Sequence, residues 1–323
     1  MKFLVVFSLL AHFGCLEVHA KAPDWFSDYL KTYPGCEQEL LCAAGEGETL
    51  ADALTNSRLE IAKFFQNKIK SKSLISTSFE QKGTNIGNAS FEEWANKTIS
   101  EETSELISGL EIKKQEVSGT KTYVLMTLNR KTTADLLKEK IEELDIENVQ
   151  LFNLNSRFAY PKLMKNLVMI QNFLERYSLL SENPMKLKIK KENVQEKINK
   201  LKPIKVGLVT TKKQLPIKLN HILVEIFSSL KVIIVPQKLS PKYSLKSEIQ
   251  IGEEYFKVEG FKKINVQFRL ELHNSKSELM GKLSALSEQV ARNSDQAIEK
   301  SLPDIKDALL ENLDQLTNIK FVD

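Results

Sequence analysis

Histidine and cysteine, the side chains most used in nucleophilic and metal chemistry, are scarce: the 323-residue chain has four histidines and three cysteines. Only His221 and His273 lie beyond Ala20, and they fall in different predicted elements. The sequence has no His-Glu-x-x-His motif, and two thiols without a nearby histidine make a poor metal-ligand set. We therefore expect no catalytic residue, no metal site and no cofactor, which favours a protein that is not an enzyme.

A strong excess of charge is also missing, as is any long apolar run beyond Ala20. The formal net charge is +4, and acidic residues are scattered among the lysines, which argues against a nucleic-acid partner. No later stretch reaches the roughly 20 apolar residues of a transmembrane helix. Between Lys186 and Lys202, seven lysines stand against two glutamates, which we interpret as a solvated connector. Contact with an anionic surface is the alternative.

The segment from Met1 to Ala20 has the pattern of a secretory signal peptide. Lys2 gives the positive start, residues 3–14 form a short apolar run, and Ala20 completes a cleavage pattern. We expect cleavage after Ala20 and a protein that is exported from the cytoplasm. Lipidation of Cys15 is the alternative, although only the glycine just before that cysteine fits a lipidation site.

Cys36 and Cys42 remain after this cleavage. An even number of cysteines in an exported chain favours a structural disulfide, with two reduced thiols as the alternative. A loop this short stabilises the fold by only about 2 kcal/mol in the chain-entropy description.

Four aromatic residues gather just after the expected cleavage site: Trp25, Phe26, Tyr29 and Tyr33. We interpret them as attaching this segment to the first domain. Because tryptophan and tyrosine also favour interfaces, contact with a partner is the alternative.

Residues 21–150 alternate between apolar patterns of strand and helix period, which predicts a sheet covered by helices. Thr49 and Asp52 have the spacing of a capping box at a helix start. Gly45 and Gly47 before it predict a tight strand-to-helix turn, with an anion-binding turn as the alternative. The predicted strands are 40–44, 73–81, 110–117 and 122–129, and the predicted helices run from Thr49 to about Lys70, over 91–107, and over 133–144 on the sheet.

The rest of the chain predicts a helical connector over 151–202 and a second α+β domain over 203–323. Strands 204–209 and 231–235 flank a helix over 216–230, which favours parallel pairing. Further strands are predicted over 245–251, 254–258 and 263–273, and a helix over 278–313 that Pro303 kinks or splits. The fold class is therefore α+β, with two sheet-plus-helix domains joined by a helical connector. Strand edges in both domains offer sites for self-assembly or for a partner.

The first domain resembles the Helicobacter-type membrane-associated lipoprotein family (the LPP-twenty lipoprotein domain) over about residues 23–145. The segments that carry the resemblance are Pro23-Asp-Trp25, Ala43-Ala-Gly-Glu-Gly47, the alanine-containing stretch 50–62, and Gly119-Thr-Lys-Thr-Tyr-Val-Leu-Met-Thr-Leu-Asn-Arg130. The second domain is only faintly similar to periplasmic domains of curli-secretion and flagellar-envelope proteins.

The resemblance implies a non-enzymatic bacterial envelope protein with a binding or assembly role, at the outer membrane or around a flagellar structure. It also implies a location in the periplasm or at the periphery of the outer membrane. Its partner would be another envelope protein or a second copy of the chain. A periplasmic protein that binds a small ligand or cell-wall glycan is the alternative, and an envelope hydrolase is a weaker one.

Overall fold

The computed structural model describes residues 21–76, 109–210, 215–239, 241–319 and 321. The expected signal peptide with Cys15, the predicted helix over 91–107 and most of the predicted strand over 73–81 lie outside these residues. The chain divides into two compact units, one containing the residues up to Lys68 with Gly109–Arg130, and the other the remainder. Both units combine a sheet with helices, which confirms the α+β class. In the described part of the chain, no helix combines the length and apolar character needed to cross a membrane.

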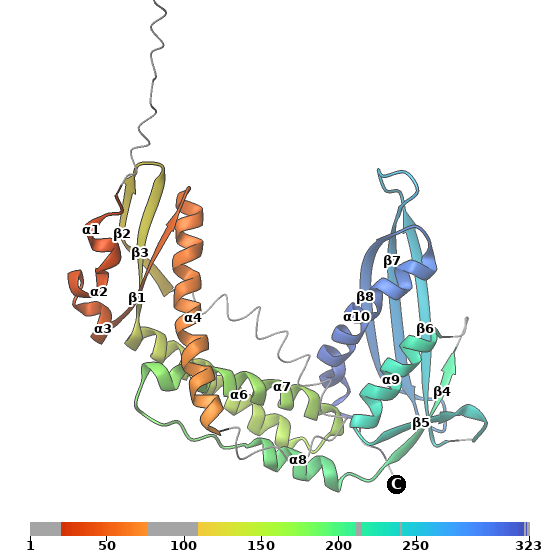
Figure 1. Cartoon of the computed structure of the whole chain (residues 1–323). Coiled ribbons are helices and arrows are strands. Elements are labelled where there is room, and N and C mark those ends of the chain that lie inside the picture. Colours follow the sequence, from red (N-terminus) through yellow and green to blue (C-terminus); the bar gives the residue numbers. More distant parts are fainter. Residues whose placement is uncertain (1–20, 77–108, 211–214, 240, 320, 322–323) are drawn as a thin grey trace, which may run out of the picture. The chain divides into compact units, whose positions relative to one another are not determined.

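The first unit is a three-stranded antiparallel sheet with helices on both faces (Figure 1). Its elements are α1 (Asp24–Ser27), α2 (Tyr29–Thr32), α3 (Gly35–Gln38), β1 (Leu40–Gly47), α4 (Leu50–Ser76), β2 (Leu110–Ser118) and β3 (Lys121–Asn129). The central strand is β3, which pairs with β1 and with β2. The predicted capping box is present, because the Asp52 carboxylate accepts from the Thr49 N–H and the Thr49 hydroxyl accepts from the Asp52 N–H.

The central strand β3 is buried along nearly its whole length because each face meets a different layer. Val124, Met126 and Leu128 point into the core shared with α4. Tyr123 and Leu125 point the other way, into a core shared with α1 and α3. A strand covered on both faces reads as a continuous apolar run, as residues 123–126 do.

The helices of the second unit are longer and less continuous than predicted. They are α6 (Arg130–Asn153), η2 (Arg157–Ala159), α7 (Tyr160–Leu180) and α8 (Lys191–Lys200). The predicted helical connector over 151–202 is interrupted at residues 181–190, which are not helical. The prediction that residues 133–144 pack on the first sheet is also wrong: Leu137 and Ile141 pack with Ile170 and Phe173 of α7.

The second sheet has five strands in the order β5-β4-β6-β7-β8. Its elements are β4 (Ile204–Thr210), α9 (Ile217–Ser229), β5 (Val232–Pro236), η3 (Gln237–Leu239), β6 (Tyr243–Glu254), β7 (Lys262–His273), β8 (Leu279–Ala291), α10 (Ser294–Asn312) and η4 (Leu313–Leu316). The predicted parallel pairing of β4 with β5 is confirmed, and β4 also pairs parallel with β6. The remaining pairs are antiparallel.

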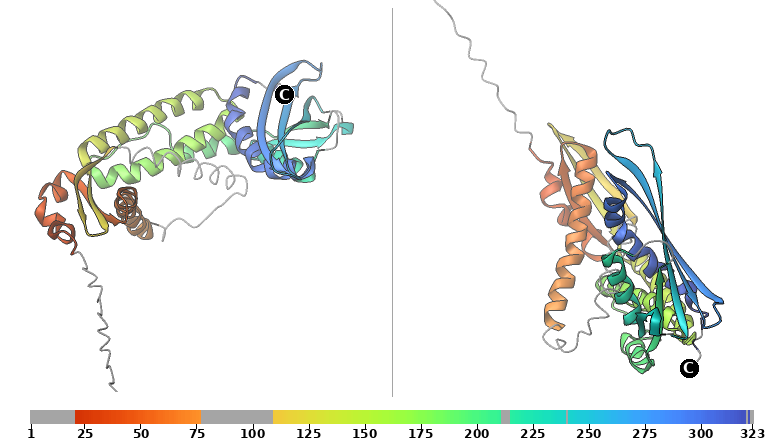
Figure 2. Two further views of the ribbon diagram at one scale, coloured as in Figure 1. Left: turned by 90° about the horizontal axis from the view of Figure 1, so that it is seen from above. Right: turned by 90° about the vertical axis from the view of Figure 1, so that its right-hand side faces the viewer.

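One core joins this sheet to its two helices, which lie on the same side of it (Figure 2). Phe268 and Leu270 of β7 meet Leu223 of α9 and Ile305 of α10 in that core. The residues between them on β7, such as Gln267 and Arg269, point to the opposite face. The α-helices thus leave one face of the sheet to polar side chains.

Two predictions fail in this sheet. Residues 279–291 form β8 and not a helix, because Leu283, Ala285 and Ser287 are buried with a period of two. The apolar residues at helical spacing, Leu279, Leu286 and Val290, are exposed. The helix that follows is continuous through Pro303 and is not split.

The predicted strand over 254–258 is likewise wrong, because β6 ends at Glu254 and the chain turns before Lys262. Gly260 has a φ of +77°, a conformation that glycine adopts readily.

Candidate binding surface

The predicted aromatic cluster lies around a disulfide on one face of the first sheet. Cys36 and Cys42 are bonded, and both are buried with Trp25 and Tyr123. The Trp25 indole N–H donates to Glu116 at 2.8 Å, and this bond attaches the N-terminal segment to β2.

Phe26, Tyr29 and Tyr33 are partly buried against the same cluster. The Phe26 ring meets the Tyr123 ring edge to face, with the ring centroids 4.8 Å apart. Burial raises the pKa of Tyr29, since a phenolate would be poorly solvated there. Contact of these aromatic residues with a partner stays a prediction.

Gly45 and Gly47 lie within β1, where α4 approaches closely. A Cβ atom at Gly45 would overlap the backbone of Ala53 and Ser57, and one at Gly47 would overlap the backbone near Asp52. The Asp52 carboxylate already accepts from the helix start, as described above, so an anion there would meet a negative charge. The role of the two glycines is therefore to allow the close approach of α4 to β1, and not to form the predicted strand-to-helix turn.

The lysine-rich segment also makes contacts within its own unit. The Lys197 ammonium donates to the Phe152 carbonyl oxygen at 2.8 Å and to the Asn155 side chain at 2.6 Å.

The two histidines beyond Ala20 lie in different elements. His221 is exposed on α9, and His273 contacts Glu271 and the Ser277 carbonyl at the end of β7. Within the described residues, no group of three or more His, Cys, Asp or Glu side chains could hold a metal ion.

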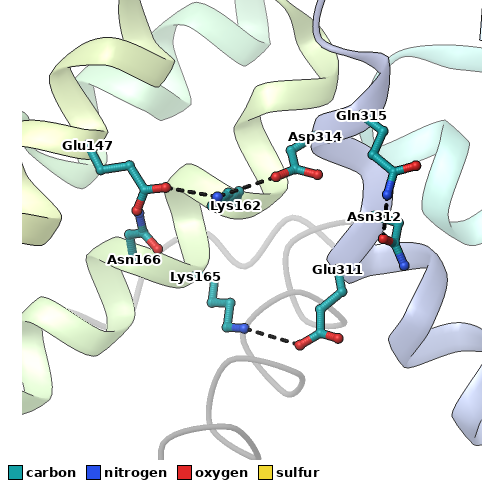
Figure 3. Close-up of polar contacts among 8 residues, drawn as sticks. All are labelled: Glu147, Lys162, Lys165, Asn166, Glu311, Asn312, Asp314 and Gln315. Atoms are coloured by element: carbon teal, nitrogen blue, oxygen red, sulfur yellow. Dashed lines mark hydrogen bonds and ion pairs between the residues drawn. The ribbon is translucent and has the colours of Figure 1, made fainter.

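A polar network joins α6 and α7 to the end of α10 and η4 (Figure 3). The Lys162 ammonium lies 2.8 Å from Glu147 and 3.3 Å from Asp314. The hydrogen bond to Glu147 is the largest influence on the pKa of Lys162 and raises it. Asn166 donates to the second oxygen of Glu147 at 2.8 Å. Because its charges face one another, this network is a structural junction and leaves little capacity for a ligand.

The tip of the β6–β7 hairpin, residues 253–262, differs from this network because it exposes apolar side chains. It projects from the sheet past the start of α10 (Figure 1). The Tyr255 side chain is 88% exposed and Val258 is 52% exposed, while Phe256 and Phe261 are partly buried. The tip residues line a hollow of about 530 Å³. Exposed aromatic and aliphatic side chains that gather in this way mark interaction sites more often than a single exposed residue does.

Ion pairs fix the base of this hairpin. Lys262 bonds to Glu253 at 2.6 Å across the two strands, and Lys263 bonds to Glu288 of β8 at 2.8 Å. The hydrogen bond from Lys262 lowers the pKa of Glu253. The Arg292 guanidinium lies over the Phe261 ring, 5.3 Å from its centroid. The tip is therefore presented on a defined base, and its composition suits binding and not proton transfer.

Sequence reasoning missed this surface because residues 254–258 were assigned to a strand. The available signal was Phe256 and Phe261 on either side of Gly260, since glycine in a polar-flanked stretch indicates a turn. An aromatic residue on a turn, unlike one on a strand, has no sheet face to bury it.

No family model matches the chain, and no curated protein matches it. Among solved structures, the secreted protein HP1454 from Helicobacter pylori is similar over 85% of this chain and 97% of its own, with 14% identity and a TM-score of 0.37. Lipoprotein GNA1162 from Neisseria meningitidis is similar over 31% of this chain and 93% of its own, with 12% identity and a TM-score of 0.23. A minor lipoprotein from Acinetobacter baumannii is similar over 36% of this chain and 93% of its own, with 12% identity and a TM-score of 0.26. Similarity at this level transfers no function, and the LPP-twenty resemblance stays a prediction.

Proposed function

We propose that this protein is a non-enzymatic component of a bacterial cell envelope that binds an envelope protein through the tip of the β6–β7 hairpin. The observation that carries the proposal is the exposure of Tyr255 and Val258 on a hairpin with a fixed base. A tyrosine adds large contact area with few rotatable bonds, which is why it is frequent at the centre of interfaces.

The cell compartment is supported by two independent features. The segment from Met1 to Ala20 has the pattern of a signal peptide. The disulfide between Cys36 and Cys42 is buried in a core, and disulfides persist in oxidising compartments such as the periplasm.

A cell-wall glycan is the second candidate for the bound partner. The hollow at the hairpin tip is lined by three aromatic residues, Tyr255, Phe256 and Phe261, together with charged side chains. Aromatic rings that offer an apolar face beside hydrogen-bonding groups suit a sugar ring, which has both kinds of surface.

Photo-crosslinking in the cells that make the protein tests the proposal. A photoreactive amino acid in place of Tyr255 is expected to form one discrete adduct, and an added Val258→Asp substitution is expected to abolish it. Ile217, which is 75% exposed on α9, is the matched control position and should give no such adduct. Mass spectrometry of the adduct distinguishes an envelope protein from a glycan fragment. Equal labelling at Tyr255 and Ile217 would rule out the hairpin as the contact.

A further inference from the structure

The outer edge of β8 has no strand beside it in the part of the chain that the structure describes, because the sheet order ends there and β8 pairs with β7 alone. At 13 residues it is the longest of the described strands. A strand edge of this kind presents N–H and C=O groups that a further strand can use. The feature invites the question of which strand fits.

The other edge strands, β5, β2 and β1, have features that disfavour pairing with a further strand. β5 has five residues and ends in Pro236. β2 has a register irregularity between Ile112 and Lys114. Two carbonyl oxygens of β1 accept hydrogen bonds from the side chains of Asn56 and Ser57. Among the described residues, the comparable contact on β8 comes near its end, where Lys300 donates to the Val290 carbonyl oxygen at 2.8 Å.

The exposed face of β8 carries Lys282, Ser284, Leu286 and Glu288 in alternation. In an antiparallel pair, residues directly opposite each other point to the same face of the sheet. A partner strand must therefore pair in a register that places its own buried residues opposite the buried residues of β8. When β8 pairs with a second copy of itself about a two-fold axis at Ala285, Lys282 lies opposite Glu288 of the second copy. By symmetry the pair occurs twice.

We propose that two copies of this chain associate through β8 in this register, so that their two five-stranded sheets become one continuous sheet. Opposite charges directly across from each other stabilise a strand pair, and like charges destabilise it. Leu286, which is 68% exposed in the single chain, then lies opposite Ser284 and diagonal to the second Leu286, within reach of side-chain contact. The bond from Lys300 to Val290 sets the end of the paired segment.

The charges on β8 provide the first test, with sedimentation velocity of the purified protein as the measurement. Lys282→Glu and Glu288→Lys each place two like-charge pairs in the interface, and each is expected to weaken dimerisation about tenfold. The double variant with both substitutions restores opposite charges and is expected to recover the dimer. Because Glu288 also bonds to Lys263, thermal unfolding of each variant checks that the fold is kept. A protein that stays monomeric at every concentration, or a dimer that neither single reversal weakens, would overturn the proposal.

Cysteine crosslinking tests the register itself. In the double variant Lys282→Cys/Glu288→Cys, the two new thiols of one chain are roughly 20 Å apart along the strand and cannot bond to each other. Across the proposed dimer they face each other and should form a covalent dimer under mild oxidation. Each single variant is a matched control that should stay uncrosslinked, because its thiol faces Glu288 or Lys282 of the second copy. Crosslinking of the single variants, or none of the double variant, would contradict the register.

Discussion

At the scale of single residues, the contact between β1 and α4 depends on the lack of a side chain at Gly45. The backbone of the strand approaches the backbone of the helix so closely that a Cβ atom at Gly45 would overlap the Ala53 carbonyl oxygen and the Ser57 amide. Ser57 uses this closeness, because its buried hydroxyl donates to the Ala43 carbonyl oxygen at 2.6 Å. Backbone atoms cannot turn aside as a flexible side chain can, so the helix as a whole would have to shift.

Replacing Gly45 with alanine is therefore expected to lower the free energy of unfolding by about 1–3 kcal/mol, the usual cost of overpacking. Urea unfolding followed by circular dichroism measures the change. Gly252→Ala in β6 is the matched control, because a Cβ there would meet only the Asn265 side chain at an ordinary 3.9 Å. That variant should match the parent or gain slightly. Equal effects at the two positions would show that close packing is not the reason for Gly45.

At the scale of elements, the junction between α7 and the end of α10 contains a cation, Lys162, that lies between two carboxylates, beside the ion pair of Lys165 with Glu311. Lys162 on α7 bridges Glu147 on the neighbouring helix α6 and Asp314 on η4, which lies 152 residues further along the chain. The pKa of Lys162 is raised, so its stabilising contribution is complete below the ordinary lysine value of 10.5. The contribution is lost as the pH rises through the higher value of the folded state.

We expect Lys162→Met to destabilise the protein at pH 8 by about 1 kcal/mol, because it removes a charged hydrogen-bond donor to two carboxylates. The difference from the parent should shrink as the pH is raised above 10.5, the ordinary pKa of a lysine, and through the higher pKa of the folded state. Urea unfolding over this pH range provides the measurement. Lys140→Met, which removes a more exposed pair with Glu143 at 3.2 Å, is the control and should cost less than about 0.5 kcal/mol. A difference that does not depend on pH would mean that packing of the lysine stem, and not its charge, holds the junction.

The elements that sequence reasoning predicted well are those with a local signal. The capping box at Thr49 placed the start of α4, and the predicted strands over 110–117 and 122–129 correspond to β2 and β3. The cysteine pairing followed from two residues alone. In each case the residues that determine the structure are close together in the sequence.

The failures have a tertiary cause. In β8, exposed leucines at helical spacing concealed a period-two pattern built from small residues such as Ala285 and Ser287, which are buried only because α10 covers them. The hairpin tip was missed for the related reason that an apolar residue was assumed to be buried. The contact between Lys162 and Asp314, which are 152 residues apart, has no local signal in the sequence.

At the scale of the whole molecule, the protein combines a disulfide-linked unit with a unit that has no cysteine among its described residues. The thiol–disulfide state of the surroundings can therefore change the covalent structure of the first unit only. That arrangement fits a chain that folds after export, where the thiols meet an oxidising environment. The form of the mature N-terminus decides between a protein that is free in the periplasm and one that is anchored.

We expect the mature protein to begin at Lys21 and to be recovered in the soluble periplasmic fraction. Intact mass spectrometry after cell fractionation, with and without mild detergent, measures both properties, and the mass should be short of two hydrogen atoms because of the disulfide. A membrane-bound form that carries diacylglycerol on Cys15 would replace this expectation with a lipoprotein. An uncleaved chain in the cytosol would contradict export altogether.

The pairing of β1 with β3 has a consequence for the order of events during secretion. Leu40 and Arg130, which contact each other at the end of this strand pair, are 90 residues apart. A chain that crosses a membrane from its N-terminus delivers β1 long before the strand that completes its sheet. The Cys36–Cys42 loop, with a separation of six residues, can close at once. Until β3 has crossed, the disulfide-closed loop is the part of the first unit's structure that is fixed by a covalent bond. During that time the apolar face of β1 is open to chaperones and proteases.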